Sequence, residues 1–115
     1  MASAVFSAGG SRAQGQLPNA KGTLDTIAAA TFCREYWVEL TNLNTTDEAV
    51  ILYKKISGGS SKIVWGGTLQ GTASGAGGRA VVPLGALAPG DLVEGVTTTA
   101  SKVDYTISAM TYGIV

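Results

Sequence analysis

From Tyr36 to Tyr112 the chain is a succession of short runs of β-forming residues separated by glycine, serine, asparagine and proline. About six or seven such runs at this spacing are typical of a sandwich or jelly roll, and not of units in which strands alternate with helices. No window of about 11 residues has the apolar spacing of an amphipathic helix. We therefore predict an all-β fold, a single antiparallel β-sandwich or jelly roll of about six to eight strands.

Local signals place several of these strands and turns. Residues 36–41 alternate between apolar and polar side chains, as a half-buried strand does. Residues 88–91, Ala-Pro-Gly-Asp, suit a type II turn, because proline presets φ at the second position and glycine supplies a positive φ at the third. The strand that begins at Arg79 is expected to end at Pro83, which cannot donate to a ladder.

The two ends of this β region are predicted with different precision. Residues 91–100 and 103–112 are expected to form a hairpin through Ala100-Ser101-Lys102. Residues 23–31 contain both β-branched residues and small alanines, so the sequence leaves them open between a strand and a short helical turn. We expect the β-sandwich domain to span residues 23–115.

Residues 49–53 form a continuous apolar run, with Val50 and Leu52 on one face of the expected strand and Ile51 and Tyr53 on the other. Apolar residues on both faces imply that both faces are covered. One face of a strand in a small sandwich meets the core, so the other face needs the N-terminal residues or another subunit. An uncovered run of this kind is an aggregation hazard.

Residues 1–22 are rich in alanine, serine, glycine and glutamine and offer too little apolar surface to fold alone. We predict an extended N-terminal arm that is ordered by a partner subunit or by a long packing against its own domain. The predicted subunit interface consists of the apolar residues of the arm and of the outer face of the 49–53 strand: Val5, Phe6, Leu17, Ile51 and Tyr53.

Composition argues for association and against several partners. Eight basic residues balance eight acidic ones, and only 14% of the residues are charged, against about 25% in typical domains. A neutral chain lacks the basic surface that binds nucleic acid or anionic membranes, and its neutrality promotes association. No run of about 18 apolar residues exists and the first residues lack a signal-peptide pattern, so we expect no membrane span and no standard export signal.

The chain has little with which to perform chemistry. It contains no histidine, the usual general base and zinc ligand, and its one cysteine, Cys33, cannot form an intrachain disulfide. Glu94 and Asp104 across the expected hairpin would be the minimum for glycoside hydrolysis, although two solvated carboxylates are favoured. We predict no enzyme, no cofactor and no metal site.

Two kinds of binding site stay open at this stage. Oxygen ligands from Asn42, Asn44, Asp47 and Glu48 would suit calcium, but their spacing matches no EF-hand loop and a plain turn is favoured. Trp37 and Trp65 with the tyrosines would suit a sugar-binding platform, although aromatic residues in strands more often belong to a core or an interface.

The order of features from Glu39 to Gly113 resembles a known group of proteins. A strand runs into Thr41-Asn42-Leu43-Asn44, a β-branched strand ends at Tyr53, and a Gly-Ser turn follows. An extended segment then leads to Leu87-Ala88-Pro89-Gly90-Asp91-Leu92 and to a last strand with Tyr105-Thr106-Ile107-Ser108. This order, over roughly two-thirds of the chain, resembles small single-domain β-sandwich virion proteins of tailed bacteriophages.

The resemblance implies a structural protein of a phage particle, located in the virion, with no catalytic residues. The leading hypothesis is a capsid decoration or cement protein that forms homo-oligomers and binds other virion proteins, above all the major capsid protein, through its sandwich and arm. A neck, tail or fibre component is the nearest alternative, and a carbohydrate-binding module is a further one.

Overall fold

The computed structural model describes residues 4–6, 10–74 and 77–114. Within these residues the chain is almost entirely β-structure, interrupted by a single turn of 3-10 helix, η1 (Thr72–Ser74). The strands are β1 (Ala4–Phe6), β2 (Gly10–Gln16), β3 (Gly22–Thr26), β4 (Thr31–Asn42), β5 (Glu48–Lys55), β6 (Ser61–Leu69), β7 (Arg79–Leu87), β8 (Leu92–Thr97) and β9 (Val103–Ile114). The predicted all-β class is confirmed.

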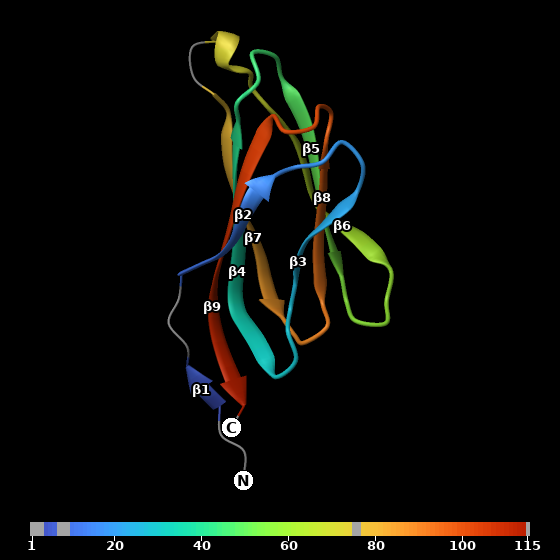
Figure 1. Ribbon diagram of the computed structural model, residues 1–115, viewed down its shortest axis with the longest axis vertical. Coiled ribbons are helices and arrows are strands. Elements are labelled where there is room, and N and C mark those ends of the chain that lie inside the picture. The colour runs from blue at the N-terminus through green and yellow to red at the C-terminus, as the bar shows by residue number, and fades with distance from the viewer. Residues whose placement is uncertain (1–3, 7–9, 75–76, 115) are drawn as a thin grey trace.

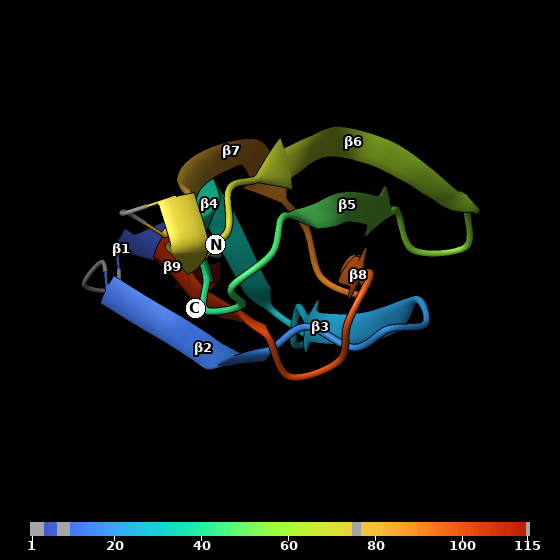
Figure 2. The ribbon, with the colours of Figure 1, turned by 90° about the horizontal axis from the view of Figure 1, so that it is seen from above.

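The strands form two antiparallel sheets that pack face to face (Figure 1). The first sheet has the order β1-β9-β4-β7, and β2 pairs with β9 as well. β1 pairs with the end of β9 and β2 with its earlier residues, so these two short strands follow one another along the same edge. The second sheet has the order β3-β8-β5-β6, and the view from above separates the two layers (Figure 2). The predicted antiparallel sandwich is confirmed.

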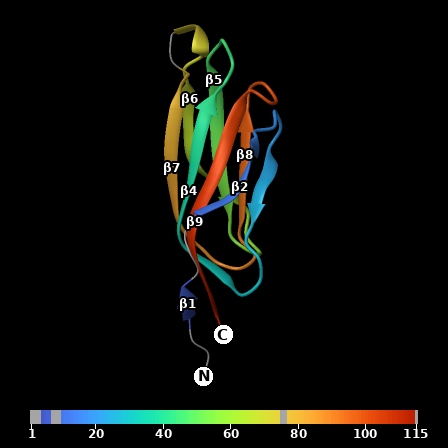
Figure 3. The same ribbon diagram turned by 60° about the vertical axis from the view of Figure 1, so that its left-hand side comes forward.

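The predicted hairpin between residues 91–100 and 103–112 is wrong. β8 lies in the second sheet between β3 and β5, whereas β9 lies in the first sheet beside β4 (Figure 3). The connection between them crosses from one sheet to the other, and it is held by backbone hydrogen bonds from Ser101 to Leu17 and from Leu43 to Lys102. β8 and β9 each carry apolar residues for the core, and crossing over lets the two strands face each other across it.

The predicted end of a strand at Pro83 is also wrong, because β7 continues through Pro83 to Leu87. β7 is an edge strand with β4 as its only neighbour among the described residues. Proline is tolerated on an edge strand, because one side of such a strand has no ladder partner to which an N–H would donate. The same proline leaves that edge poorly suited to accept a further strand.

Other local predictions hold. The turn at residues 88–91 has a φ of 88° at Gly90, and the Asp91 N–H donates to the Ala88 carbonyl at 3.1 Å, as a type II turn requires. Residues 23–31, left open by the sequence, contain most of strand β3 and then a turn in which Ala30 has a φ of 60°.

The core lies between the two sheets and takes every second residue of the central strands. Val50 and Leu52 of β5 are buried at 1% and 0% exposure, as predicted, while Ile51 and Tyr53 point to the other side and are half-buried. The largest fully buried apolar side chains come from both sheets and from the segments before and after β3: Tyr36, Leu17, Ile27, Leu40, Leu52 and Ile107. No helix in the described residues is long and apolar enough to cross a membrane.

Candidate functional site

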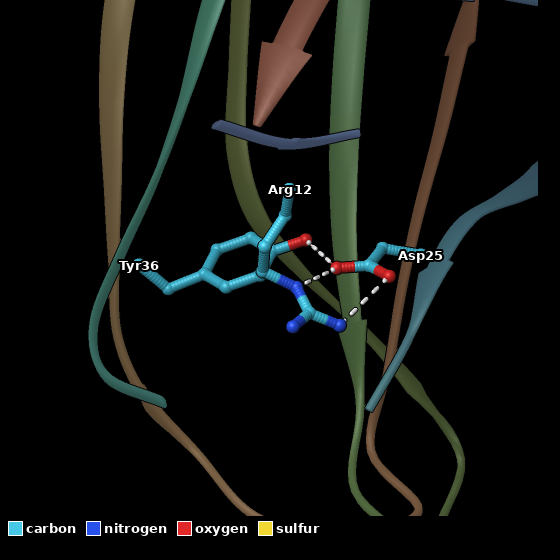
Figure 4. Close-up of polar contacts among 3 residues, drawn as sticks. All are labelled: Arg12, Asp25 and Tyr36. Carbon is cyan, nitrogen blue, oxygen red and sulfur yellow. Dashed lines mark hydrogen bonds and ion pairs between the residues drawn. The ribbon is translucent and has the colours of Figure 1, made fainter. Parts of the chain in front are cut away.

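A partly buried polar cluster of Arg12, Asp25 and Tyr36 joins the two sheets (Figure 4). Arg12 Nε donates to Asp25 Oδ2 at 2.8 Å and Nη2 donates to Oδ1 at 3.3 Å, while Tyr36 Oη donates to Oδ2 at 2.9 Å. Arg12 belongs to β2 and Tyr36 to β4, both in the first sheet, whereas Asp25 belongs to β3 in the second. We call these three residues the inter-sheet cluster.

A β-bulge explains how a charged residue of the N-terminal segment enters the interior. The register between β2 and β9 shifts between Ser11 and Ala13, so Arg12 is the extra residue that leaves the ladder. Next to it, Gly15 passes close to the ring of Tyr105: a Cβ at Gly15 would lie 2.9 Å from the tyrosine oxygen. The bulge and the glycine together let β2 lie along β9 with its arginine turned inward.

The electrostatics of the inter-sheet cluster favour a fixed ion pair. The hydrogen bond with Asp25 raises the pKa of Arg12, and burial, reinforced by the Asp25 charge, raises the pKa of Tyr36 far above its usual value. Both oxygens of Asp25 accept hydrogen bonds inside the chain and the only hydroxyl proton of Tyr36 is donated to it. The arrangement therefore works as a cross-link between sheets.

A second polar network ties the loops at the β4–β5 end of the molecule. Glu48 is fully buried and accepts hydrogen bonds from Asn44 Nδ2 at 3.1 Å, from the Thr99 backbone at 3.2 Å and from Thr97 Oγ1 at 3.5 Å. The amide of Asn42 donates to three backbone carbonyls, each at 3.0 Å. Every buried polar side-chain atom of the described residues has a partner, as folded interiors require.

The residues that could bind calcium are engaged in hydrogen bonds of this network. The Asn42 amide oxygen accepts from the Asn44 backbone N–H and the Asn44 amide oxygen accepts from the Thr45 backbone N–H, each at 2.8 Å. The Asp47 carboxylate accepts from the Gly71 backbone N–H at 2.9 Å. The described residues contain no group of three or more acidic or cysteine side chains that could hold a metal ion. The residues act as a polar turn.

The structure separates the residues of the possible carboxylate pair and those of the possible sugar-binding platform. Glu94 lies on the second sheet, where it accepts a hydrogen bond from Ser61, and Asp104 lies on the first sheet, where it accepts one from Gln16. They do not form the carboxylate pair that glycoside hydrolysis needs. Trp65 packs against the core, whereas Trp37 lines a shallow hollow on the outer face of the first sheet, so the two rings share no platform.

The predicted interface residues fall into three places. The backbone of Val5 and Phe6 belongs to β1 and pairs with Gly113 and Tyr112, while their side chains lie outside the described part of the structure. Leu17 is fully buried in the core of its own chain. Ile51 and Tyr53 lie half-buried on the outer face of the second sheet, with Lys21 Nζ 5.1 Å from the centre of the Tyr53 ring. Their role in a subunit interface stays a prediction, as does the domain boundary between residues 22 and 23.

The outer face of the first sheet also carries apolar residues, which are absent from the predicted interface. Val81 is 65% exposed, and together with Trp37 and Pro83 it lines the shallow hollow on that face. The pairing of Trp37 with Pro83 places these two side by side across β4 and β7. A signal existed in the sequence, since Val81-Val82 is apolar on both faces of its strand, as residues 49–53 are.

Comparison with known proteins gives one informative likeness. No protein-family model matches the chain, and no curated protein matches it. Among solved structures, the fold is similar to a chain described under "Bacillus endospore appendages form a novel family of disulfide-linked pili". The match has a TM-score of 0.52 and 12% sequence identity, and it covers 98% of this chain and 87% of the other. At this identity the likeness shows the fold alone.

The likeness overturns the predicted resemblance to phage virion proteins. That resemblance rested on turn and strand signals over part of the chain, whereas the structural match extends over nearly all of it and leads to a pilus protein. The predictions of a virion location and of capsid decoration are wrong with it, and the predicted partnership with the major capsid protein has no support. Strand and turn signals are shared by unrelated sandwiches, so they carry no information on which particle a sandwich belongs to.

Proposed function

We propose that this chain is a non-enzymatic subunit of a pilus-like surface fibre built from many copies of itself. The carrying observation is the structural likeness to a chain from disulfide-linked pili, which extends over 98% of this chain. The inter-sheet cluster and the Glu48 network support the proposal, because both are satisfied within the chain and serve the rigidity that a fibre subunit needs. A fibre component, which the sequence allowed beside the capsid hypothesis, fits better than a capsid clamp.

The proposed fibre differs from its structural neighbour in how its subunits are held together. A linear polymer joined by disulfides needs at least two thiols in each subunit, and these 115 residues contain one. That one, Cys33, is 1% exposed, and burial raises the pKa of its thiol, which makes it a poor nucleophile for disulfide exchange. We therefore propose non-covalent contacts between copies.

The proposal is tested by concentrating the purified chain and following assembly by sedimentation and electron microscopy. Filaments of uniform width are expected to form with and without a thiol reductant, and the Cys33→Ala variant is expected to form the same filaments. A protein that stays monomeric at every concentration up to the millimolar range would refute the fibre. Filaments that dissolve in reductant would refute the non-covalent contacts.

A further inference from the structure

The outer faces of the two sheets carry net charges of opposite sign, and each face also carries apolar side chains. We call them the first outer face, on the sheet that contains β4, and the second outer face, on the sheet that contains β5. An antiparallel sheet that faces water normally carries polar residues on that side. Both outer faces of this molecule carry a cluster of apolar side chains instead.

The second outer face is built around Ile51 and Tyr53. Register places Val96 opposite Ile51 on β8, and Ile63, which is 65% exposed, opposite Tyr53 on β6. Opposite Ile51 on its other side stands Gly66, where a Cβ would meet only a backbone oxygen at 4.0 Å. The glycine leaves open space beside Ile51, so this face combines apolar side chains with room for a side chain from outside.

Cations border this apolar surface. Lys21 lies over the ring of Tyr53, and Lys55 follows Tyr53 at the next position of the same face. The carboxylate on this face, Glu94, stands opposite Tyr53 and already accepts a hydrogen bond from Ser61. Lys21 and Lys55 outnumber this one carboxylate, so the net charge of the second outer face is positive.

The first outer face shows the complementary arrangement. Its apolar hollow is lined by Trp37, Val81 and Pro83, with Glu35 at its border. Register places Glu39 opposite Val81, and further along β9 Asp104 shares the face with Thr41. Arg79 at the start of β7 and exposed Arg34 beside Glu35 offset part of this charge. The three carboxylates, Glu35, Glu39 and Asp104, remain in excess of these two cations.

We infer that the second outer face docks on the first outer face of another copy of this chain, apolar cluster on apolar hollow and lysines on carboxylates. The contact is heterologous, since it uses two different surfaces of the subunit, and such a contact repeats without closing unless its rotation forms a ring. Burial of the apolar cluster supplies affinity, and the opposite charges fix orientation and disfavour contacts between like faces. The inference rests on the proposed fibre and assigns the surfaces that build it.

Charge reversal on each face separately provides the test. One variant carries Lys21→Glu and Lys55→Glu on the second outer face, and the other carries Glu35→Lys and Glu39→Lys on the first. Each variant alone places like charges at every contact, so the concentration needed for assembly should rise at least about tenfold. In an equimolar mixture each contact can join opposite charges again, and co-assembly near the wild-type concentration is expected.

The outcomes separate this inference from the proposed function. If the wild-type chain forms filaments and both reversed variants do so at the same concentration, the faces are not the contact and the sheet edges or the N-terminal segment hold the fibre. If the variants fail alone and also fail when mixed, the pairing of these two faces is refuted. Circular dichroism and thermal unfolding of each variant show that the subunits remain folded. A wild-type chain that never assembles refutes the proposed function itself.

Discussion

The interior of the sandwich and its outer surfaces differ in where polar and apolar side chains lie. Inside, even the charged residues Arg12, Asp25 and Glu48 are hydrogen-bonded, and no buried polar side-chain atom of the described residues lacks a partner. Outside, apolar side chains such as Ile63 and Val81 are 65% exposed. The polar groups of the interior are satisfied within one chain, whereas the outer faces are the surfaces on which we infer that a second copy docks.

Residues of the interior and residues of the outer faces are therefore expected to have different roles. Interior residues set the stability of the subunit, and changes there should alter the free energy of unfolding first. Residues of the outer faces should leave unfolding almost unchanged and alter assembly instead. Substitutions in the two regions therefore test whether folding and assembly are carried by separate parts of the chain.

The largest loss of stability is expected from Asp25→Ala. The substitution leaves the Arg12 guanidinium and the Tyr36 hydroxyl without their common acceptor between the sheets. Removing one partner of a partly buried ion pair that also accepts a tyrosine hydroxyl is destabilising, and we expect a loss of about 3 kcal/mol in the free energy of unfolding, measured by chemical denaturation.

Asp104→Ala is the matched control, since Asp104 lies on the outer face and its carboxylate accepts an exposed hydrogen bond from Gln16. It should change the free energy of unfolding by no more than about 0.5 kcal/mol. Equal losses in the two variants would contradict the view that the inter-sheet cluster joins the sheets.

A smaller effect, with a distinct dependence on pH, is expected from Tyr36→Phe. At neutral pH the variant loses one hydrogen bond to Asp25, worth about 1 kcal/mol. The pKa of Tyr36 is raised in the folded chain, so above about pH 10 the unfolded chain releases this proton while the folded chain retains it. The free energy of unfolding of the parent should then fall by up to about 1.4 kcal/mol per pH unit, and the variant should lack this part of the fall.

This comparison is made in a Cys33→Ala background. The pKa of the Cys33 thiol is raised as well, so it contributes its own loss of stability above about pH 8.5. In this background, denaturation curves at pH 8, 10 and 11 report the contribution of Tyr36 without that of the thiol. Parallel declines in parent and variant between pH 10 and 11 would show that Tyr36 does not retain its proton in the folded chain.

The sequence was sufficient for features that depend on neighbouring residues. Alternation predicted the strand at residues 36–41, and the order Pro-Gly predicted the type II turn that ends with Asp91. These features are local, because the chemistry of adjacent residues determines φ and the direction of side chains. The burial of Val50 and Leu52 with Ile51 turned outward followed from the same reasoning.

Features that depend on which strands meet were not predictable in the same way. Ala100-Ser101-Lys102 has the composition of a turn, but composition does not say whether the chain turns back within one sheet or crosses to the other. The inward position of Arg12 depends on a bulge that no residue announces. Asp25 and Tyr36 are 11 residues apart in sequence and meet only because their strands lie in facing sheets.

The comparison between interior and outer surface can be made on two adjacent residues of one strand. Val82 is 3% exposed and faces the core, whereas Val81 is 65% exposed and lines the hollow beside Trp37. Val82→Ser should cost about 2 kcal/mol of unfolding free energy, since it removes apolar contacts and buries a hydroxyl. Val81→Ser should change it by less than about 0.5 kcal/mol.

For filament formation, measured at a temperature where both variants are folded, Val81→Ser should have the larger effect and Val82→Ser the smaller one. Val81→Ser removes an apolar contact from the inferred docking surface and should raise the concentration needed for assembly, whereas Val82→Ser should leave that concentration close to the wild-type value. The two substitutions are chemically identical and one residue apart, so propensity and strand position are matched between them. If assembly instead followed subunit stability in both variants, folding and assembly would share the same residues and the separation of the two regions would not hold.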